Sequence, residues 1–323
     1  MSFKNVIGQE EAIGILTSYI SGSRLPHALI FSGPEGVGKS LVAKELAKAL
    51  NCEKDGIDSC DECSTCRRID SLNHPDVSWV TPVGSSIKIE QIRSLRSQIS
   101  LRPYEARYKV YIIDNAEAMT EEAQNAFLKT LEEPPPRSYL ILISSKPQSL
   151  LPTISSRCQV LRFRTLNFER IKDALISRYS LDSAKAHFLA YLSGGRLGEA
   201  IGRMHDDILV KKNRVIDEAH SVLSKGESIG WQNEPKEEIV GRLEILIDWY
   251  RDLLLLGEGE SVPLINVDRR EDLIGLKDGY SAEVLITNIY ELNRAKELIL
   301  ANVNPKIALD VMVHKIKKVT SNQ

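Results

Sequence analysis

The segment from Gly33 to Ser40 has the residue types and spacing of a phosphate-binding loop. It reads G-x-x-x-x-G-K-S and ends in Gly38, Lys39 and Ser40. Glycines let successive backbone N–H groups point at one anion, the lysine reaches the β- and γ-phosphates of a nucleotide, and the serine hydroxyl holds Mg²⁺. A loop that no longer binds nucleotide is the alternative. The expected contacts from this loop are Gly33, Gly36, Val37, Gly38, Lys39 and Ser40.

Four of the five cysteines lie close together in the sequence, at Cys52, Cys60, Cys63 and Cys66. Four thiolates at this spacing, in a reducing compartment, suit a tetrahedral Zn²⁺ site. An iron–sulfur cluster is the rival interpretation, but the bacterial ferredoxin run continues with a downstream Cys-Pro that is absent here. We therefore predict a zinc knuckle over residues 52–66, and Cys158 is not needed as a ligand.

Polar residues follow the apolar run of residues 110–113. Asp114 comes first, at the carboxyl end of a predicted strand, where a carboxylate could hold Mg²⁺; a turn or a helix cap is the alternative. NTPases of this architecture usually have Glu next, as the base that orients the attacking water. This chain has Asn115, and an amide accepts no proton, so we expect weak or absent hydrolysis. Glu117 is expected to point elsewhere, because it lies two residues further on; the alternative is that it substitutes as the base.

A second pair of polar residues, Ser144 and Ser145, follows another apolar run. A hydroxyl at the end of that strand could reach the γ-phosphate, so Ser145 is a candidate nucleotide contact. A simple strand-ending turn is an equally good interpretation.

These residues need a scaffold, and the apolar pattern predicts one. Alternating strands and helices over about 165 residues favour an α/β domain with a parallel sheet covered on both faces. The predicted strands lie within residues 27–31, 74–80, 108–113, 139–143 and 159–163. Helices are predicted after Gly8 and over 41–50, 89–99 and the stretch through Ala123, Phe127 and Leu131, and a short helix or turn over 154–157.

After Thr165 the strand signals stop. Helical patterns follow, notably at 237–256, 281–301 and 305–318, and the Gly- and Asp-rich segment 257–280 is predicted to be a loop. We therefore expect three domains: an α/β nucleotide domain over 1–165, a small helical domain over 166–205 and a larger helical domain over 206–323.

The composition limits the function classes. The chain has 323 residues, of which 42% are hydrophobic and 27% are charged, as in soluble globular proteins. The formal charge of −2 gives no global basic signature, so nucleic-acid contact would need a local patch. The N-terminus resembles no secretory signal, and the aliphatic run 253–256 is too short to span a bilayer. We expect a cytoplasmic protein.

Three longer motifs carry a family resemblance. They are VYIID at 110–114, QNAFLKTLEEPP at 124–135 and LPTISSRC at 151–158. Together with the knuckle after the phosphate loop and NVNPK at 302–306, they resemble the AAA+ subunits of the bacterial DNA polymerase III clamp loader. The resemblance covers nearly the whole chain. It implies that the first domain is an AAA+ P-loop domain, that the small helical domain over 166–205 is its lid, and that the larger helical domain over 206–323 is a collar that joins subunits.

The resemblance also separates two kinds of subunit. The ATPase subunit (gamma/tau) would have Glu at the position of Asn115 and Arg in the lid helix at the position of Gly198. Arg196 lies two residues away and would face another direction on a helix. The resemblance therefore implies a related subunit with little or no ATPase activity. A gamma/tau-like ATPase, another DNA-dependent AAA+ ATPase and an adaptor that never binds nucleotide remain the alternatives.

The implied partners are the ATPase (gamma/tau) and delta subunits in a five-membered ring, the sliding clamp (beta) and the backbone of primed DNA. Arg157 would act in trans as an arginine finger on the neighbouring ATPase site. Lys88, Arg93 and Arg96 are candidate DNA contacts. The plainer interpretations are a structural ion pair for Arg157 and a solvated helix face for the other three.

Overall fold

The computed structural model describes residues 2–54, 56–225, 229–257 and 263–320. The chain divides into two compact units. The first contains Met1–Ile171 and Ser193–Glu199, and the second contains Lys172–Leu192 and Ala200–Gln323. This division into two units does not test the boundaries predicted for the lid and the collar, which remain predictions.

A five-stranded parallel sheet forms the centre of the first unit. Its strand order is β2-β3-β4-β1-β5, as the alternating pattern predicted. The strands are β1 (Ala28–Ser32), β2 (Val77–Val80), β3 (Lys109–Ile113), β4 (Ser138–Ser144) and β5 (Gln159–Arg162). Because all five run in the same direction, their carboxyl ends meet at one edge of the sheet. Ser32 pairs with Ser144 at that edge.

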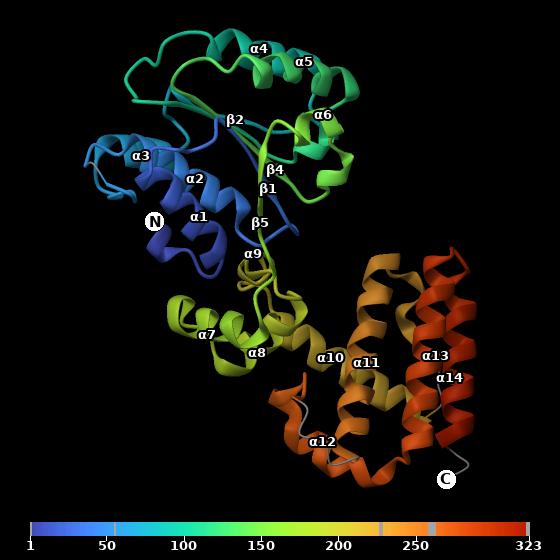
Figure 1. The fold of residues 1–323 in the computed structure, drawn as a ribbon. Helices are drawn as coiled ribbons and strands as arrows, with labels where there is room; N and C mark the ends of the chain where they lie inside the picture. The colour runs from blue at the N-terminus through green and yellow to red at the C-terminus, as the bar shows by residue number, and fades with distance from the viewer. Residues whose placement is uncertain (1, 55, 226–228, 258–262, 321–323) are drawn as a thin grey trace. The chain divides into compact units, whose positions relative to one another are not determined.

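Helices cover both faces of this sheet, and Figure 1 shows the two layers in blue and in green. One face packs against α1 (Glu10–Ser21), α2 (Lys39–Asn51) and α3 (Ser64–Asp70). The other packs against α4 (Ile89–Ile99), α5 (Glu121–Glu132) and α6 (Pro152–Ser155). Side chains alternate along β1, so Leu29 and Phe31 enter the first core while Ala28 and Ile30 enter the second. This explains why the central strands β1, β3 and β4 are apolar at consecutive positions.

The described part of the second unit is helical. Its helices are α7 (Phe168–Tyr179, which begins in the first unit), α8 (Ser183–Leu192), the end of α9 (Leu197–Gly202), α10 (Ile208–Lys225), α11 (Lys236–Gly257), α12 (Arg270–Leu276), α13 (Ala282–Leu300) and α14 (Pro305–Thr320). α11 and α13 pack together, with Trp249, Leu253 and Leu292 buried in the core. No described helix has the length and apolar character needed to cross a membrane.

The prediction of a loop over residues 257–280 is wrong in part. Residues 258–262 lie outside the described residues, but α12 and short 3₁₀ turns occupy much of the remainder. α12 forms because Leu273 is fully buried in the core that includes α11. This contact between distant parts of the chain outweighs the local Gly and Asp content.

Candidate functional site

The phosphate loop connects β1 to α2 at the carboxyl edge of the sheet. Gly33 must be glycine, because a Cβ there would lie 2.2 Å from the carbonyl oxygen of Phe163. The backbone N–H of Gly33 donates to the oxygen of Ser144, 3.2 Å away. Gly38 has a φ of 99° and precedes α2, whose N-terminus favours a bound anion. The predicted strand–loop–helix context is therefore present.

Lys39 and Ser40 are the first two residues of α2, directly after the loop. The Lys39 ammonium donates to the carbonyl oxygens of Gly33 and Pro34, each 2.6 Å away. The Ser40 hydroxyl donates to Asp114 Oδ2 at 3.1 Å, so the two predicted Mg²⁺ ligands lie side by side. Burial lowers the pKa of Lys39, and nearby carboxylates partly offset this. An arriving phosphate would replace the two carbonyl contacts with a stronger charge-assisted bond.

Gln9 holds the loop from outside and was missed by sequence reasoning. Its side-chain amide donates to the oxygens of Val37 (3.2 Å) and Arg164 (2.7 Å), and its Oε1 accepts from the Arg164 N–H. Gln9 has a positive φ of 62°. The one signal in the sequence that could have pointed to Gln9 is its place directly after Gly8.

Asn115 and Glu117 lie in the turn that follows β3. Asn115 is exposed and has a φ of 53°. This left-handed turn leads into a 3₁₀ turn at Ala116–Ala118. Within that turn the Glu117 side chain reaches Ser145, at the end of the neighbouring strand β4, so the prediction that Glu117 points elsewhere is wrong. Its Oε1 accepts the backbone N–H of Ser145 at 3.0 Å and the Ser145 hydroxyl at 2.5 Å. The Ser145 hydroxyl proton is thus already in use.

Glu117 is ionised at neutral pH. Burial raises the pKa of its carboxyl, but the hydrogen bonds from Ser145 outweigh burial, and the net pKa is lowered. The same carboxylate raises the pKa of Lys39. The candidate nucleotide site therefore contains a second acid beside Asp114, although not at the position of Asn115.

The phosphate loop also contacts the beginning of α9. The Gly198 N–H donates to the oxygen of Gly36 at 2.8 Å. A Cβ on Gly198 would lie 2.9 Å from that same oxygen, so only glycine allows the contact as it stands. Arg196 pairs with Glu199 and donates to the oxygen of Ser193.

Arg157 lies on the surface directly after α6. It pairs with Glu132 at 2.9 Å and donates to the oxygen of Thr153 at 3.0 Å. The two charged side chains are 39% and 49% exposed. An exposed pair of this kind contributes little to stability, so Arg157 can leave Glu132 at low cost.

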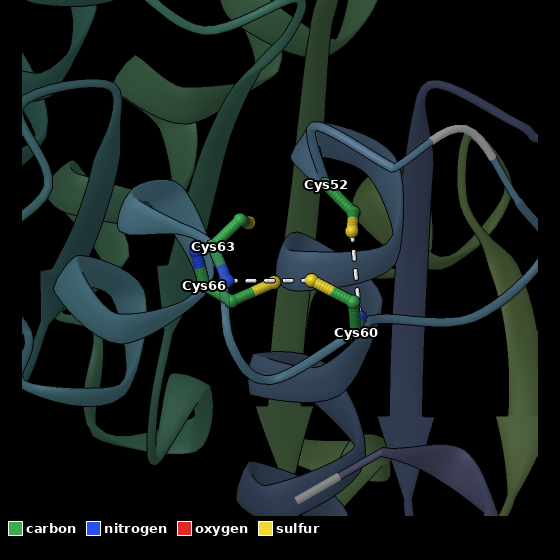
Figure 2. A group of neighbouring side chains, drawn as sticks. All are labelled: Cys52, Cys60, Cys63 and Cys66. Atoms are coloured by element: carbon green, nitrogen blue, oxygen red, sulfur yellow. Dashed lines mark hydrogen bonds between the residues drawn. The ribbon is translucent and has the colours of Figure 1, made fainter.

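The four cysteines of the predicted knuckle come together, as Figure 2 shows. Their Sγ atoms all lie within 4.8 Å of one another. Sulfurs around one metal at 2.3 Å would be about 3.8 Å apart, so the group needs only a small contraction. Backbone N–H groups of Cys60, Cys63 and Cys66 donate to the sulfurs of Cys52, Cys60 and Cys63, each at 3.4 Å.

The electrostatics of these thiols differ. Backbone N–H groups of Glu62 and Cys63 lower the pKa of Cys60 to about 6, whereas burial raises the pKa values of Cys52 and Cys66. A neutral buried thiol readily loses its proton to a bound cation. The donor set, the sulfur spacing and the N–H···S bonds all fit a metal ion at this position.

A buried lysine connects the knuckle to α2. The Lys48 ammonium is fully buried and contacts Glu45 (2.9 Å), Asp61 (2.5 Å) and Asp70 (3.1 Å). Asp61 lies between two of the cysteines, and Asp70 ends α3. One cation thus joins three elements around the cysteine group.

The three candidate DNA contacts are all exposed. Arg93 and Arg96 line a groove of about 500 Å³ between α4 and α5, together with Lys129 and Thr130. Lys88 lies at the beginning of α4.

Two family models match this chain. The model described as DNA polymerase III, delta subunit, matches residues 8–167, and the one described as DNA polymerase III, delta subunit, C terminal, matches residues 230–317. The first match contains the phosphate loop, the cysteine group and Arg157.

Similar proteins of known name are also subunits of DNA polymerase III. The chain is 33% identical to DNA polymerase III subunit delta' of Bacillus subtilis, over 94% of this chain and 95% of the relative. It is 30% identical to subunit tau of the same organism, over 99% of this chain but 62% of tau. Among solved structures, it is similar to a gamma-subunit-related protein from Thermotoga maritima, at 18% identity over 96% and 99% of the two chains, with a TM-score of 0.40.

Proposed function

Because this chain belongs to the delta-prime family of DNA polymerase III clamp-loader subunits, we propose that it serves as the delta-prime subunit of a clamp loader. In this role it helps the ring to place the sliding clamp (beta) on primed DNA. The observation that carries the proposal is the match to delta' over nearly the full length of both chains. The ATPase (gamma/tau) and delta subunits complete the ring.

The subunit binds a magnesium nucleotide and turns it over poorly. The phosphate loop, Lys39 and the adjacent Ser40 and Asp114 support binding. Asn115 supports poor turnover, since an amide cannot accept the proton of an attacking water. The bound nucleotide would then regulate conformation and supply no work of its own.

Arg157 supplies an arginine finger in trans. Its exposed position and its weak pair with Glu132 support this role, because the side chain is free to reach a neighbouring subunit. There the planar guanidinium would stabilise charge that develops on the γ-phosphate.

The cysteine group holds Zn²⁺. Cys52, Cys60, Cys63 and Cys66 would be the four ligands, and a closed four-thiolate site would give structural support without chemistry of its own. Metal analysis of purified protein should give about one zinc per chain. Iron with labile sulfide would contradict this part of the proposal. Reduced cysteines also suit the cytoplasm.

The helical C-terminal part forms the collar that joins the subunits, and α4 faces the DNA. Large exposed apolar side chains support the collar role: Ile286 and Tyr290 on α13, and Ile307 and Val311 on α14. The exposed cations Lys88, Arg93 and Arg96 support a weak, sequence-independent contact with the phosphate backbone.

The deciding experiment is reconstitution of the ring with the ATPase and delta subunits, clamp and primed DNA. Omitting this chain should abolish clamp loading. Arg157→Ala should leave assembly and its own nucleotide binding intact but lower ring ATP hydrolysis, since losing a finger costs on the order of 10³–10⁵ in rate at the affected site. Other sites keep their own fingers, so the total loss is smaller. Arg157→Lys should not rescue it.

Arg164→Ala is the matched control, because Arg164 also forms an exposed ion pair, with Glu11. It should leave turnover unchanged. Full turnover by an assembled Arg157→Ala ring would return Arg157 to a structural role. Clamp loading by a ring that lacks the chain would refute the delta-prime assignment.

A further inference from the structure

The contact between Glu117 and Ser145 lies at the carboxyl edge of the sheet, beside the strand that leads into the phosphate loop. Ser145 directly follows β4, and its neighbour Ser144 pairs with Ser32, the last residue before the phosphate loop. The Gly33 N–H also donates to the Ser144 oxygen. Ser145, which the sequence made a candidate phosphate contact, is therefore one residue away from the strand pairing that adjoins the start of the loop.

Glu117 already takes both donors of Ser145. Its Oε1 accepts the backbone N–H at 3.0 Å and the hydroxyl at 2.5 Å. Its Oε2 is buried and has no hydrogen-bond partner in the described part of the chain. A serine hydroxyl has a single proton to donate. A γ-phosphate could gain this proton only if the contact with Glu117 broke.

The negative charge of Glu117 also acts on Lys39. Among the carboxylates that raise the pKa of Lys39, Glu117 has the largest effect, ahead of Asp114 and Glu35. Coulombic effects fall with distance and rise with burial. The Glu117 carboxylate therefore acts on the Lys39 ammonium together with the predicted Mg²⁺ ligand. A γ-phosphate that approaches Lys39 would meet this second negative charge.

A diphosphate ends before the γ position, so it does not need the Ser145 proton, and it brings less negative charge toward Glu117 than a triphosphate does. We propose that Glu117 is a specificity-determining residue, which makes this phosphate loop prefer nucleoside diphosphates to nucleoside triphosphates. The proposal rests on the nucleotide binding proposed above and names the ligand class of that site. It also gives Glu117 a role other than proton acceptor, since an acid held ionised by two donors is a poor base near neutral pH.

The test compares the affinities for MgADP and MgATP by calorimetry on the full chain. Wild-type protein should bind ADP more tightly. Glu117→Gln keeps the shape and an acceptor oxygen but removes the charge, so the affinity for ATP should rise about tenfold while that for ADP changes less than about twofold. Glu121→Gln, an exposed acid at the start of α5, removes the same charge elsewhere and should leave the ratio unchanged.

Glu117→Ala is the second variant and should shift the ratio in the same direction, because it frees the Ser145 hydroxyl completely. Thermal unfolding identifies any variant that fails to fold. An ADP-to-ATP ratio unchanged in both variants would overturn the inference while leaving nucleotide binding in place. Wild-type ATP turnover that disappears in Glu117→Gln would overturn it in favour of a base. No binding of either nucleotide by wild-type protein would refute both proposals.

Discussion

Lys48 is a fully buried ammonium that carboxylates surround. Burial alone would lower its pKa, but hydrogen bonds to Asp61 and Glu45 raise the pKa above the ordinary value, so Lys48 stays charged. Glu45 is equally buried. Removing one partner of a buried ionic group leaves the other charge uncompensated, which costs far more than an exposed pair ever contributes.

We predict that Lys48→Met lowers the free energy of unfolding by about 3–5 kcal/mol at pH 7. It should also speed the release of knuckle-bound metal to a chelator, since Asp61 and Asp70 lose their common partner. Denaturant titration and chelator kinetics measure the two effects. Lys44→Met is the control: its pair with Asp70 is longer, 3.4 Å, and partly exposed, so it should cost less than about 1 kcal/mol. Equal stabilities for the two variants would contradict this assignment.

Asp248 makes folding depend on pH. It accepts the Tyr191 hydroxyl at 3.0 Å, and burial raises its pKa to about 6. The unfolded value is about 3.9. Because the folded pKa is the higher one, the associated stability is complete below about pH 4 and is lost as the pH rises through 6.

We predict that Asp248→Asn stabilises the protein at pH 8 by about 1–2 kcal/mol, less than the full shift because the group is partly exposed. At pH 4 it should change little, since the amide oxygen still accepts the Tyr191 hydroxyl. Melting curves across pH 4–8 would show this. Asp206→Asn, at an exposed position, should follow the wild-type profile. A wild-type slope in Asp248→Asn would disprove the assignment.

At the scale of elements, the start of α9 rests on the phosphate loop. The Gly198 N–H and the Gly36 oxygen form the contact, and a methyl group at Gly198 would have to displace backbone atoms. An arginine, which the ATPase resemblance would place here, has no room in this arrangement. The glycine therefore fixes how closely the helix approaches the loop.

We predict that Gly198→Ala lowers stability by about 1–2 kcal/mol and alters nucleotide affinity, although alanine favours helix by about 1 kcal/mol. Gly202→Ala, in the same helix with nothing within 4 Å of its added Cβ, should be neutral or stabilising. Calorimetric melting and nucleotide titration separate the two variants. Identical behaviour would mean that the loop and α9 separate freely.

Elements with strong apolar patterns were predictable. The strands and the longer sheet-covering helices α1, α2, α4 and α5 were, because each has a repeating set of apolar side chains; α4, for example, runs Ile89–Ile99 as expected. α3 and α12 were not, since each is short and buries few side chains: Cys66 and Ile69 in α3, and Leu273 in α12. Short helices gain their stability from contacts that local sequence does not contain.

The site was predictable where a motif fixes its geometry, as in the phosphate loop and the cysteine spacing. Glu117 was not, because its direction depends on the left-handed turn at Asn115. Gln9 was not either, because its partners Val37 and Arg164 lie far along the chain. Contacts between residues so far apart in the sequence depend on the tertiary fold and leave no local pattern.

At the scale of the whole molecule, the chain passes between the two compact units three times, after residues 171, 192 and 199. Residues 193–199 belong to the first unit although the second unit has already begun. We predict that a single cut between α7 and α8, at an engineered protease site near Ser180, leaves both fragments together in gel filtration. The C-terminal fragment would still contain residues 193–199, which pack in the first unit with the N-terminal fragment. Fragments that separate without denaturant would contradict this.

The same return of the chain has a consequence for synthesis. A ribosome delivers the first 171 residues before it delivers Ser193–Glu199, so the nascent phosphate loop leaves the exit tunnel without Gly198 against it. Residues 172–192, which belong to the other unit, must be translated before this neighbour arrives. The order of translation thus leaves the loop uncovered for a time, when cellular nucleotide could occupy it and help the newborn sheet to fold.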